Sequence, residues 1–166
     1  MGTGKSGRYL NTEGSATSVS DFALVHSDEG KLYYDSRNKK MKLGSGGHGQ
    51  KGLEYLERLN IEHKITKVYS NGVRVGNVKD HFEKNKRKGD NQSWFPKEWT
   101  TKDIKKAGEY VMSLKTNREN LKDGKSYFGT YRGVRVGVKL TDMKISTIFP
   151  DAYKQPNKIN RTRRKC

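Results

Sequence analysis

A helical repeat of apolar residues follows Thr100. Apolar positions recur there every three or four residues, with polar residues between them, which predicts an amphipathic helix. Thr100 can cap its N-terminus, and Asp103 is placed to reach back to the cap. A second repeat predicts a helix from about Gln50 to Asn60. The apolar positions of the two repeats are Ile104, Ala107, Val111 and Leu114, and Leu53, Leu56 and Leu59.

Strand patterns occupy much of the remaining chain. Asn71-Gly72 lies between β-branched runs, Ile65 to Tyr69 and Val73 to Val75, and predicts a β-hairpin. Helices and hairpins in this order favour an α+β fold, with helices packed on antiparallel sheets, over a parallel α/β fold. The other predicted strands are Lys31 to Asp35, about Ser126 to Tyr131, Arg132 to Leu140 and Ile145 to Phe149.

A five-residue motif occurs twice. Gly72-Val73-Arg74-Val75-Gly76 recurs as Gly133-Val134-Arg135-Val136-Gly137. In both copies valines alternate with an arginine, as in a strand with one buried face. The repeat is compatible with two similar subdomains, and equally with coincidence in a chain rich in Gly, Val and Arg.

The charge of the chain is strongly unbalanced. Its 166 residues include 35 Lys and Arg against 18 Asp and Glu, a net charge of +17. Such an excess predicts a polyanionic partner, of which nucleic acid is the commonest. Residues 1–20, rich in Gly, Ser and Thr, are predicted to be a linker, 21–151 the folded domain and 152–166 a basic tail. A second basic cluster consists of Lys84, Lys86, Arg87 and Lys88.

Composition excludes several classes of protein. The single cysteine, Cys166, allows neither an internal disulfide nor a cysteine-based zinc site, and carboxylates at ligand spacing are lacking, so no metal or cofactor is expected. No apolar run reaches the ~20 residues of a membrane-spanning helix, so no membrane anchor is expected. The N-terminus lacks the apolar segment of a signal peptide. We therefore expect a cytoplasmic protein or a module of a larger exported one.

Two of the four histidines lie in settings that attract phosphate. His48 stands in a glycine-rich loop before a predicted helix, whose N-terminus favours anions, and His81 opens the basic cluster. Two imidazoles suffice for RNA cleavage without a metal, because one can deprotonate the 2′-hydroxyl while the other protonates the leaving 5′-oxygen. His26, at the end of an apolar run, and His63 are predicted to be structural.

Several motifs, in the same order along the chain, resemble bacterial EndoU nuclease domains. These domains occur as C-terminal toxin modules of contact-dependent growth inhibition proteins and other secreted polymorphic toxins. The resemblance covers about Lys42 to Asp151. Its motifs are Ser45-Gly46-Gly47-His48-Gly49-Gln50, the segment from Tyr69 to Val78, His81, Gln92-Ser93-Trp94-Phe95-Pro96 and Ser146-Thr147-Ile148-Phe149-Pro150.

The resemblance implies a site with two histidines and a lysine. The histidines fall on His48 and His81, the former acting as acid and the latter as base by the family's order, and the lysine falls on Lys125. Relatives carry a Thr/Ser-x-Tyr-Pro element that contacts the base, and Thr147 and Phe149 occupy its polar and aromatic positions. Because phenylalanine replaces tyrosine, strict uridine specificity is not expected. Lys84, Lys86, Arg87 and Lys88 are predicted to contact RNA.

The resulting prediction is a metal-independent toxin endoribonuclease that leaves a 2′,3′-cyclic phosphate. The resemblance implies tRNA as substrate, delivery as part of a larger secreted or cell-surface toxin, action in the target-cell cytoplasm, and a cognate immunity protein, expected to be acidic. The alternative is a non-catalytic basic RNA-binding protein, which explains the charge equally well but assigns no role to His48 in its glycine loop. A metal-dependent DNase is disfavoured by the lack of carboxylates around the histidines.

Overall fold

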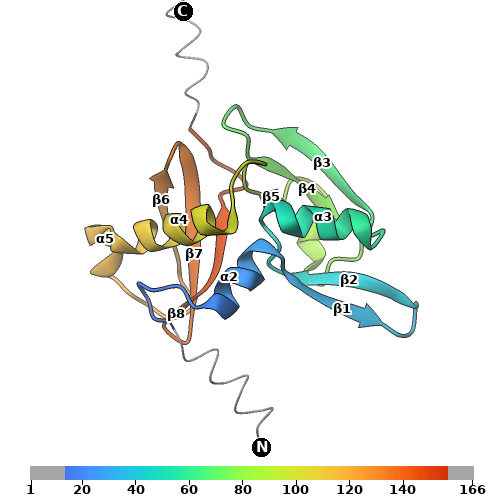
Figure 1. The fold of residues 1–166 in the computed structure, drawn as a ribbon, viewed down its shortest axis with the longest axis horizontal. Coiled ribbons are helices and arrows are strands. Elements are labelled where there is room, and N and C mark those ends of the chain that lie inside the picture. The colour runs from blue at the N-terminus through green and yellow to red at the C-terminus, as the bar shows by residue number, and fades with distance from the viewer. Residues whose placement is uncertain (1–13, 157–166) are drawn as a thin grey trace, which may run out of the picture.

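The computed structural model describes residues 14–156 of the chain (Figure 1). The expected α+β class is confirmed: helices alternate with antiparallel sheets. In chain order the elements are α2 (Asp21–Asp28), β1 (Lys31–Asp35), β2 (Lys40–Ser45), α3 (Gln50–Arg58), β3 (His63–Val68), β4 (Arg74–Val78), the 3-10 helix η1 (Lys84–Arg87), β5 (Gln92–Trp94), α4 (Thr101–Ser113), α5 (Lys115–Arg118), β6 (Ser126–Tyr131), β7 (Val134–Thr141) and β8 (Lys144–Pro150).

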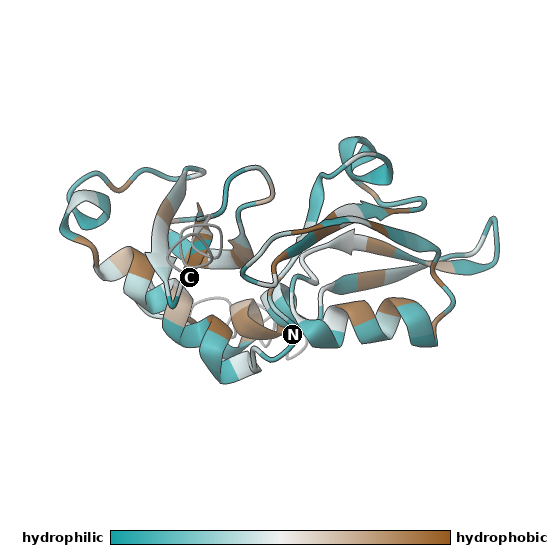
Figure 2. Cartoon of the chain, turned by 90° about the horizontal axis from the view of Figure 1, so that it is seen from above, coloured by the Kyte–Doolittle hydropathy of each residue, from teal (hydrophilic) through white to brown (hydrophobic). Residues whose placement is uncertain are grey.

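The strands form three antiparallel sheets. β1 pairs with β2, β4 lies between β3 and β5, and β7 lies between β6 and β8. Figure 2 shows the last sheet with α4 and α5 in one half of the molecule, and α3 with the first two sheets in the other. α2 joins the halves, because it packs against β8 and α4 and also touches α3.

The two copies of the repeated motif lie at corresponding places. Each overlaps the central strand of a three-stranded sheet, β4 or β7, and each sheet follows a helix in the chain, α3 or α4. The two arginines have different partners: Arg74 donates to Gln50 Oε1 at 2.8 Å, and Arg135 to Asp151 Oδ2 at 2.9 Å. Both halves therefore have a helix followed by a three-stranded sheet, but the arginines of the repeated motif make different contacts.

The predicted amphipathic helices pack as their patterns require. α4 begins with a capping box between Thr100 and Asp103, and its apolar stripe is buried against the sheet of β6, β7 and β8. Leu114 is the C-cap residue of α4. α3 buries Leu53 and Leu56 in a second, smaller core beside Trp94. Both helices are therefore held mainly by burial of one apolar face.

The linker prediction is wrong for residues 14–20. Val19 is buried in the larger core, and the backbone N–H of Ile145 donates to Ser15 O at 2.9 Å. Ser20 caps α2 by accepting a hydrogen bond from Ala23 N at 3.1 Å. These residues are therefore part of the folded domain. Residues 1–13 of the predicted linker and 157–166 of the predicted basic tail lie outside the described residues.

Candidate active site

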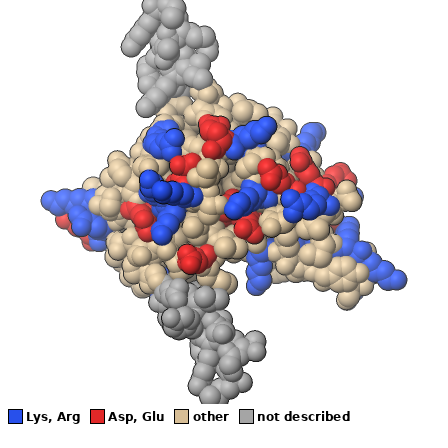
Figure 3. Space-filling model, viewed as in Figure 1, with Lys and Arg blue, Asp and Glu red and all other residues tan. Residues whose placement is uncertain are grey.

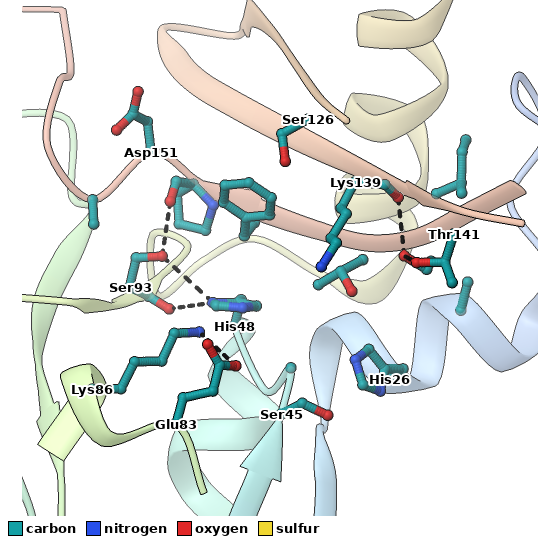
Figure 4. A pocket seen from close by; sticks show the side chains of 18 of the residues that line it. His26, Ser45, His48, Glu83, Lys86, Ser93, Ser126, Lys139, Thr141 and Asp151 are labelled. Carbon is teal, nitrogen blue, oxygen red and sulfur yellow. Dashed lines mark hydrogen bonds and ion pairs between the residues drawn. The ribbon is translucent and has the colours of Figure 1, made fainter. Parts of the chain in front are cut away.

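A cavity of about 600 Å³ lies between the two halves of the molecule (Figure 4). Its floor is one face of the sheet of β6, β7 and β8, while α4 covers the other face. α2, the glycine loop before α3 and the segment around η1 form its walls. Polar and aromatic residues that line the cavity include His26, His48, Lys86, Asn91, Ser93, Ser126, Phe128, Lys139, Thr147, Phe149, Asp151 and Tyr153.

Strand register decides which side chains form the cavity floor. Lys139 pairs with Ser126 on one side and Thr147 on the other, giving a polar row. Gly137 pairs with Phe128 and Phe149, giving an aromatic row whose two rings meet edge to face at 5.9 Å. Because alternate residues of a strand point to opposite faces, Ile148 faces the core between Thr147 and Phe149. The predicted base-contacting residues Thr147 and Phe149 therefore both line the cavity.

The glycine loop brings His48 beside the end of α2. The N–H groups of Gly47 and His48 donate to the carbonyls of His26 and Ser27 at 3.0 and 2.6 Å, so the two segments run side by side. Gly46 adopts φ +67°, which favours glycine, and a Cβ there would lie 3.0 Å from the His26 ring and against the His26 carbonyl. The loop composition is therefore explained by close approach of two backbones.

His48 is buried with one nitrogen committed. Its Nδ1 lies 2.8 Å from the carbonyl oxygen of Ser93, and its ring centroid lies 5.9 Å from that of Phe149. A carbonyl only accepts, so Nδ1 carries the proton of the neutral ring and Nε2 keeps a lone pair. Burial, reinforced by Lys86, holds the pKa of His48 well below its usual value. At neutral pH this imidazole is therefore a proton acceptor.

His26, predicted to be structural, also lines the cavity. It ends the apolar run of α2 and is half-buried, and burial, with Lys31 and Lys86 nearby, lowers its pKa. Figure 4 shows His26 and His48 on the same side of the cavity, with Lys139 extending toward them from the sheet. Sequence analysis did not select His26 or Lys139. The sequence signal for these two residues was weak: His26 precedes the glycine loop in the chain, and Lys139 precedes the motif that contains Thr147.

Lys86 reaches the cavity from η1. Its ammonium group lies 3.8 Å from Glu83 Oε2, and burial lowers its pKa. Lys86 lines the same cavity as His26 and His48, and its positive charge lowers the pKa of both histidines. Of the predicted basic cluster, Lys86 lines the cavity and Lys84, Arg87 and Lys88 do not.

The structure does not place His81 or Lys125 on the cavity wall. His81 is completely buried, with Nδ1 accepting from Glu83 N at 2.9 Å, and burial, with Lys86 and Arg87 nearby, lowers its pKa to about 4. Lys125 is exposed, and its ammonium group lies 5.1 Å from the centre of the Tyr127 ring. The predicted grouping of His48, His81 and Lys125 is thus not the grouping found around the cavity.

The remaining sequence predictions concern the surface and the core. Trp94, Phe95 and Trp99 are buried, and the rings of Phe95 and Trp99 stack with their centres 5.0 Å apart, so these aromatic side chains are part of the core. On the face shown in Figure 3, cationic side chains are interspersed with acidic ones. Among residues 14–156, no three His, Cys, Asp or Glu side chains cluster as metal ligands would. No helix in that range is long and apolar enough to cross a membrane.

A comparison with protein families decides the relationship of the chain. The family model described as bacterial EndoU nuclease matches residues 28–152. The chain belongs to this family. The expected resemblance is thereby confirmed and extended beyond Lys42 towards the N-terminus. The matched segment contains His48, Lys86, Lys139, Thr147 and Phe149, and begins two residues after His26. No curated protein and no solved structure is significantly similar to the chain.

Gly46→Ala is expected to disrupt the EndoU cavity. A methyl group would press on the His26 ring and carbonyl and separate the two histidine segments.

Gly133→Ala is the matched control, because Gly133 also has a left-handed conformation, φ +80°, but an added Cβ would meet no described atom within 4 Å. The control should lose about 1 kcal/mol of stability and keep its activity. Gly46→Ala should lose more stability and about 10²-fold in cleavage rate. Equal effects in urea unfolding and RNA cleavage assays would contradict this account.

Proposed function

We propose that this protein is a metal-independent toxin endoribonuclease that cuts RNA by attack of a 2′-hydroxyl on the adjacent phosphate. The observation that carries the proposal is the convergence of two histidines and a lysine, His26, His48 and Lys139, on one cavity with Thr147 and Phe149 in its floor. Two imidazoles supply a base and an acid, and the lysines supply the positive charge that a phosphorane requires.

His48 is assigned as the general base. Its Nε2 lone pair can accept the proton of the 2′-hydroxyl, because the Ser93 carbonyl holds the proton on Nδ1. The freed 2′-oxygen attacks phosphorus, and a bond to it forms as the bond from phosphorus to the 5′-oxygen breaks. This role is the reverse of the one that the family resemblance implied for His48.

His26 is assigned as the general acid. A lowered pKa makes its imidazolium a stronger acid, and a bound phosphate favours that protonated form. Donating its proton to the departing 5′-oxygen leaves a 5′-hydroxyl and a 2′,3′-cyclic phosphate. Lys139 and Lys86 lie where they can stabilise charge on the phosphate oxygens.

Thr147 and Phe149 are proposed to hold the nucleotide next to the cut. The Thr147 hydroxyl can donate or accept a hydrogen bond, and Phe149 offers an aromatic surface that tolerates every base. The biological setting proposed from the family resemblance is a module of a larger secreted or cell-surface toxin that acts on tRNA in the target-cell cytoplasm. An acidic immunity protein covering the cavity would complement the net charge of +17.

Incubation of the protein with tRNA in excess EDTA tests the proposal. We expect cleavage to continue, and the fragments to carry 2′,3′-cyclic phosphate and 5′-hydroxyl ends by mass spectrometry. Cleavage that stops in EDTA would contradict metal independence. A shift of RNA mobility without new ends would instead identify a binding protein.

A further inference from the structure

One tyrosine that lines the cavity, Tyr153, has no role in the proposed chemistry. Tyr153 follows β8 and lines the cavity, and 70% of its surface is exposed. The cavity floor extends along β8, a strand of about 20 Å, and its lining continues through Asp151 to Tyr153. This length exceeds one nucleotide.

Tyr153 is fixed at both ends despite its exposure. Its hydroxyl donates to Asn91 Oδ1 at 2.6 Å, and its backbone N–H donates to Asp151 Oδ1 at 2.8 Å. Asp151 is itself tied to β7, because Arg135 donates to its other oxygen at 2.9 Å. An exposed ring held in this way loses little conformational entropy when a ligand stacks on it.

Asn91 serves to position the ring. Its amide nitrogen donates to the carbonyls of Asn85 at 2.7 Å and Lys88 at 3.2 Å, so both of its protons are used. Its oxygen accepts from Tyr153. Reading of a base edge by Asn91 is therefore restricted, which leaves stacking as the chemistry available at this end.

The Phe149 ring is less available for stacking. It is half-buried and packs against Phe128 at 5.9 Å and His48 at 5.9 Å, both measured between ring centres. Tyr153 presents the more open aromatic surface of the cavity residues. Bases of single-stranded RNA stack on such surfaces with little regard to sequence.

We propose that Tyr153 is a stacking platform for the base of a second nucleotide, next to the one held at Phe149. The protein then binds a dinucleotide unit of single-stranded RNA, with the phosphate between the two bases beside His48, whose ring centre lies 5.9 Å from that of Phe149. This subsite rests on the proposed function. It accepts any base, and purines bind more tightly because they stack over a larger area.

The test measures binding to a 2′-deoxy dinucleotide, which cannot be cut, and to a 3′-mononucleotide by titration calorimetry. Tyr153→Ala should weaken dinucleotide binding about 5- to 100-fold and leave mononucleotide binding unchanged. Tyr153→Phe keeps the ring and should stay within about threefold of the original affinity. Tyr34→Ala is the matched control, because Tyr34 is 58% exposed on β1 and does not line the cavity.

Two results would overturn the subsite. Unchanged dinucleotide affinity in Tyr153→Ala would show that the ring contacts no base. Equal weakening for both ligands would show that Tyr153 shapes the cavity instead of binding a second base. If the unmodified protein still cuts RNA in EDTA in either case, only the subsite fails. If it neither cuts RNA nor binds either ligand, the proposed function fails as well.

Discussion

His48→Ala and His26→Ala are each expected to slow RNA cleavage by about 10²- to 10⁴-fold, the usual contribution of a positioned base or acid. Both imidazoles line the cavity, and no other histidine among residues 14–156 does so. RNA affinity should change little, because the lysines proposed to contact phosphate, Lys86 and Lys139, remain. Single-turnover cleavage and filter binding measure the two quantities separately.

His81 and His63 provide the controls for this experiment. His81 was the partner expected from sequence, but it is buried and does not line the cavity, so His81→Asn should lower the rate far less than His26→Ala. His63 contacts the Ile61 carbonyl at 2.8 Å, and His63→Ala should cut RNA at the original rate. Normal cleavage by His26→Ala together with a large loss in a folded His81→Asn protein would restore the pairing of His48 with His81.

The protein is expected to lose stability as the pH falls from 7 to 4.5, in part because of His81. The pKa of His81 is about 4 in the folded protein against 6.5 as the ordinary value, so between these values the unfolded chain binds more protons. The free energy of unfolding therefore decreases as the pH is lowered from 7 to 4.5. His81 contributes about 2 kcal/mol to this decrease. Buried His48 acts in the same direction.

Urea unfolding at pH 7 and pH 4.5 measures this loss. His81→Asn removes the titrating group, so the difference between the two pH values should shrink by about 2 kcal/mol. His63→Asn serves as a control for replacing a histidine elsewhere in the chain. A pH difference in His81→Asn equal to that of the original protein would show that His81 protonates without cost in the folded state.

Local patterns predicted the elements whose signals are local. The capping box and apolar stripe of α4 and the three leucines near Gln50 identified both helices, because helix formation depends on neighbours within one or two turns. α2 escaped prediction because its apolar run is short and partly exposed, with Phe22 half exposed. Its stability comes from packing on β8, a contact between residues more than 100 positions apart.

Of the site residues selected from the sequence, some line the cavity and others do not. His48 was selected by its glycine loop, and Thr147 and Phe149 by their resemblance to a family element, and all three line the cavity. His81 was selected because it opens the basic cluster, and Lys125 by its place in the family's motif order, and neither signal determines distance in space. Their positions depend on how the basic segment after β4 folds back and on where β6 begins.

The sequence by itself determined the α+β class, the strong positive charge and the family, and it selected His48 in its glycine loop, which lines the cavity. These depend on composition, on short-range periodicity and on motif order. Only the tertiary structure decided that His26 and Lys139 line the same cavity as His48 and that His81 is buried and does not line it. The physical reason is that the site lies between two halves of the chain. Backbone hydrogen bonds between α2 and the glycine loop, and the register of β7 against β8, bring its residues together.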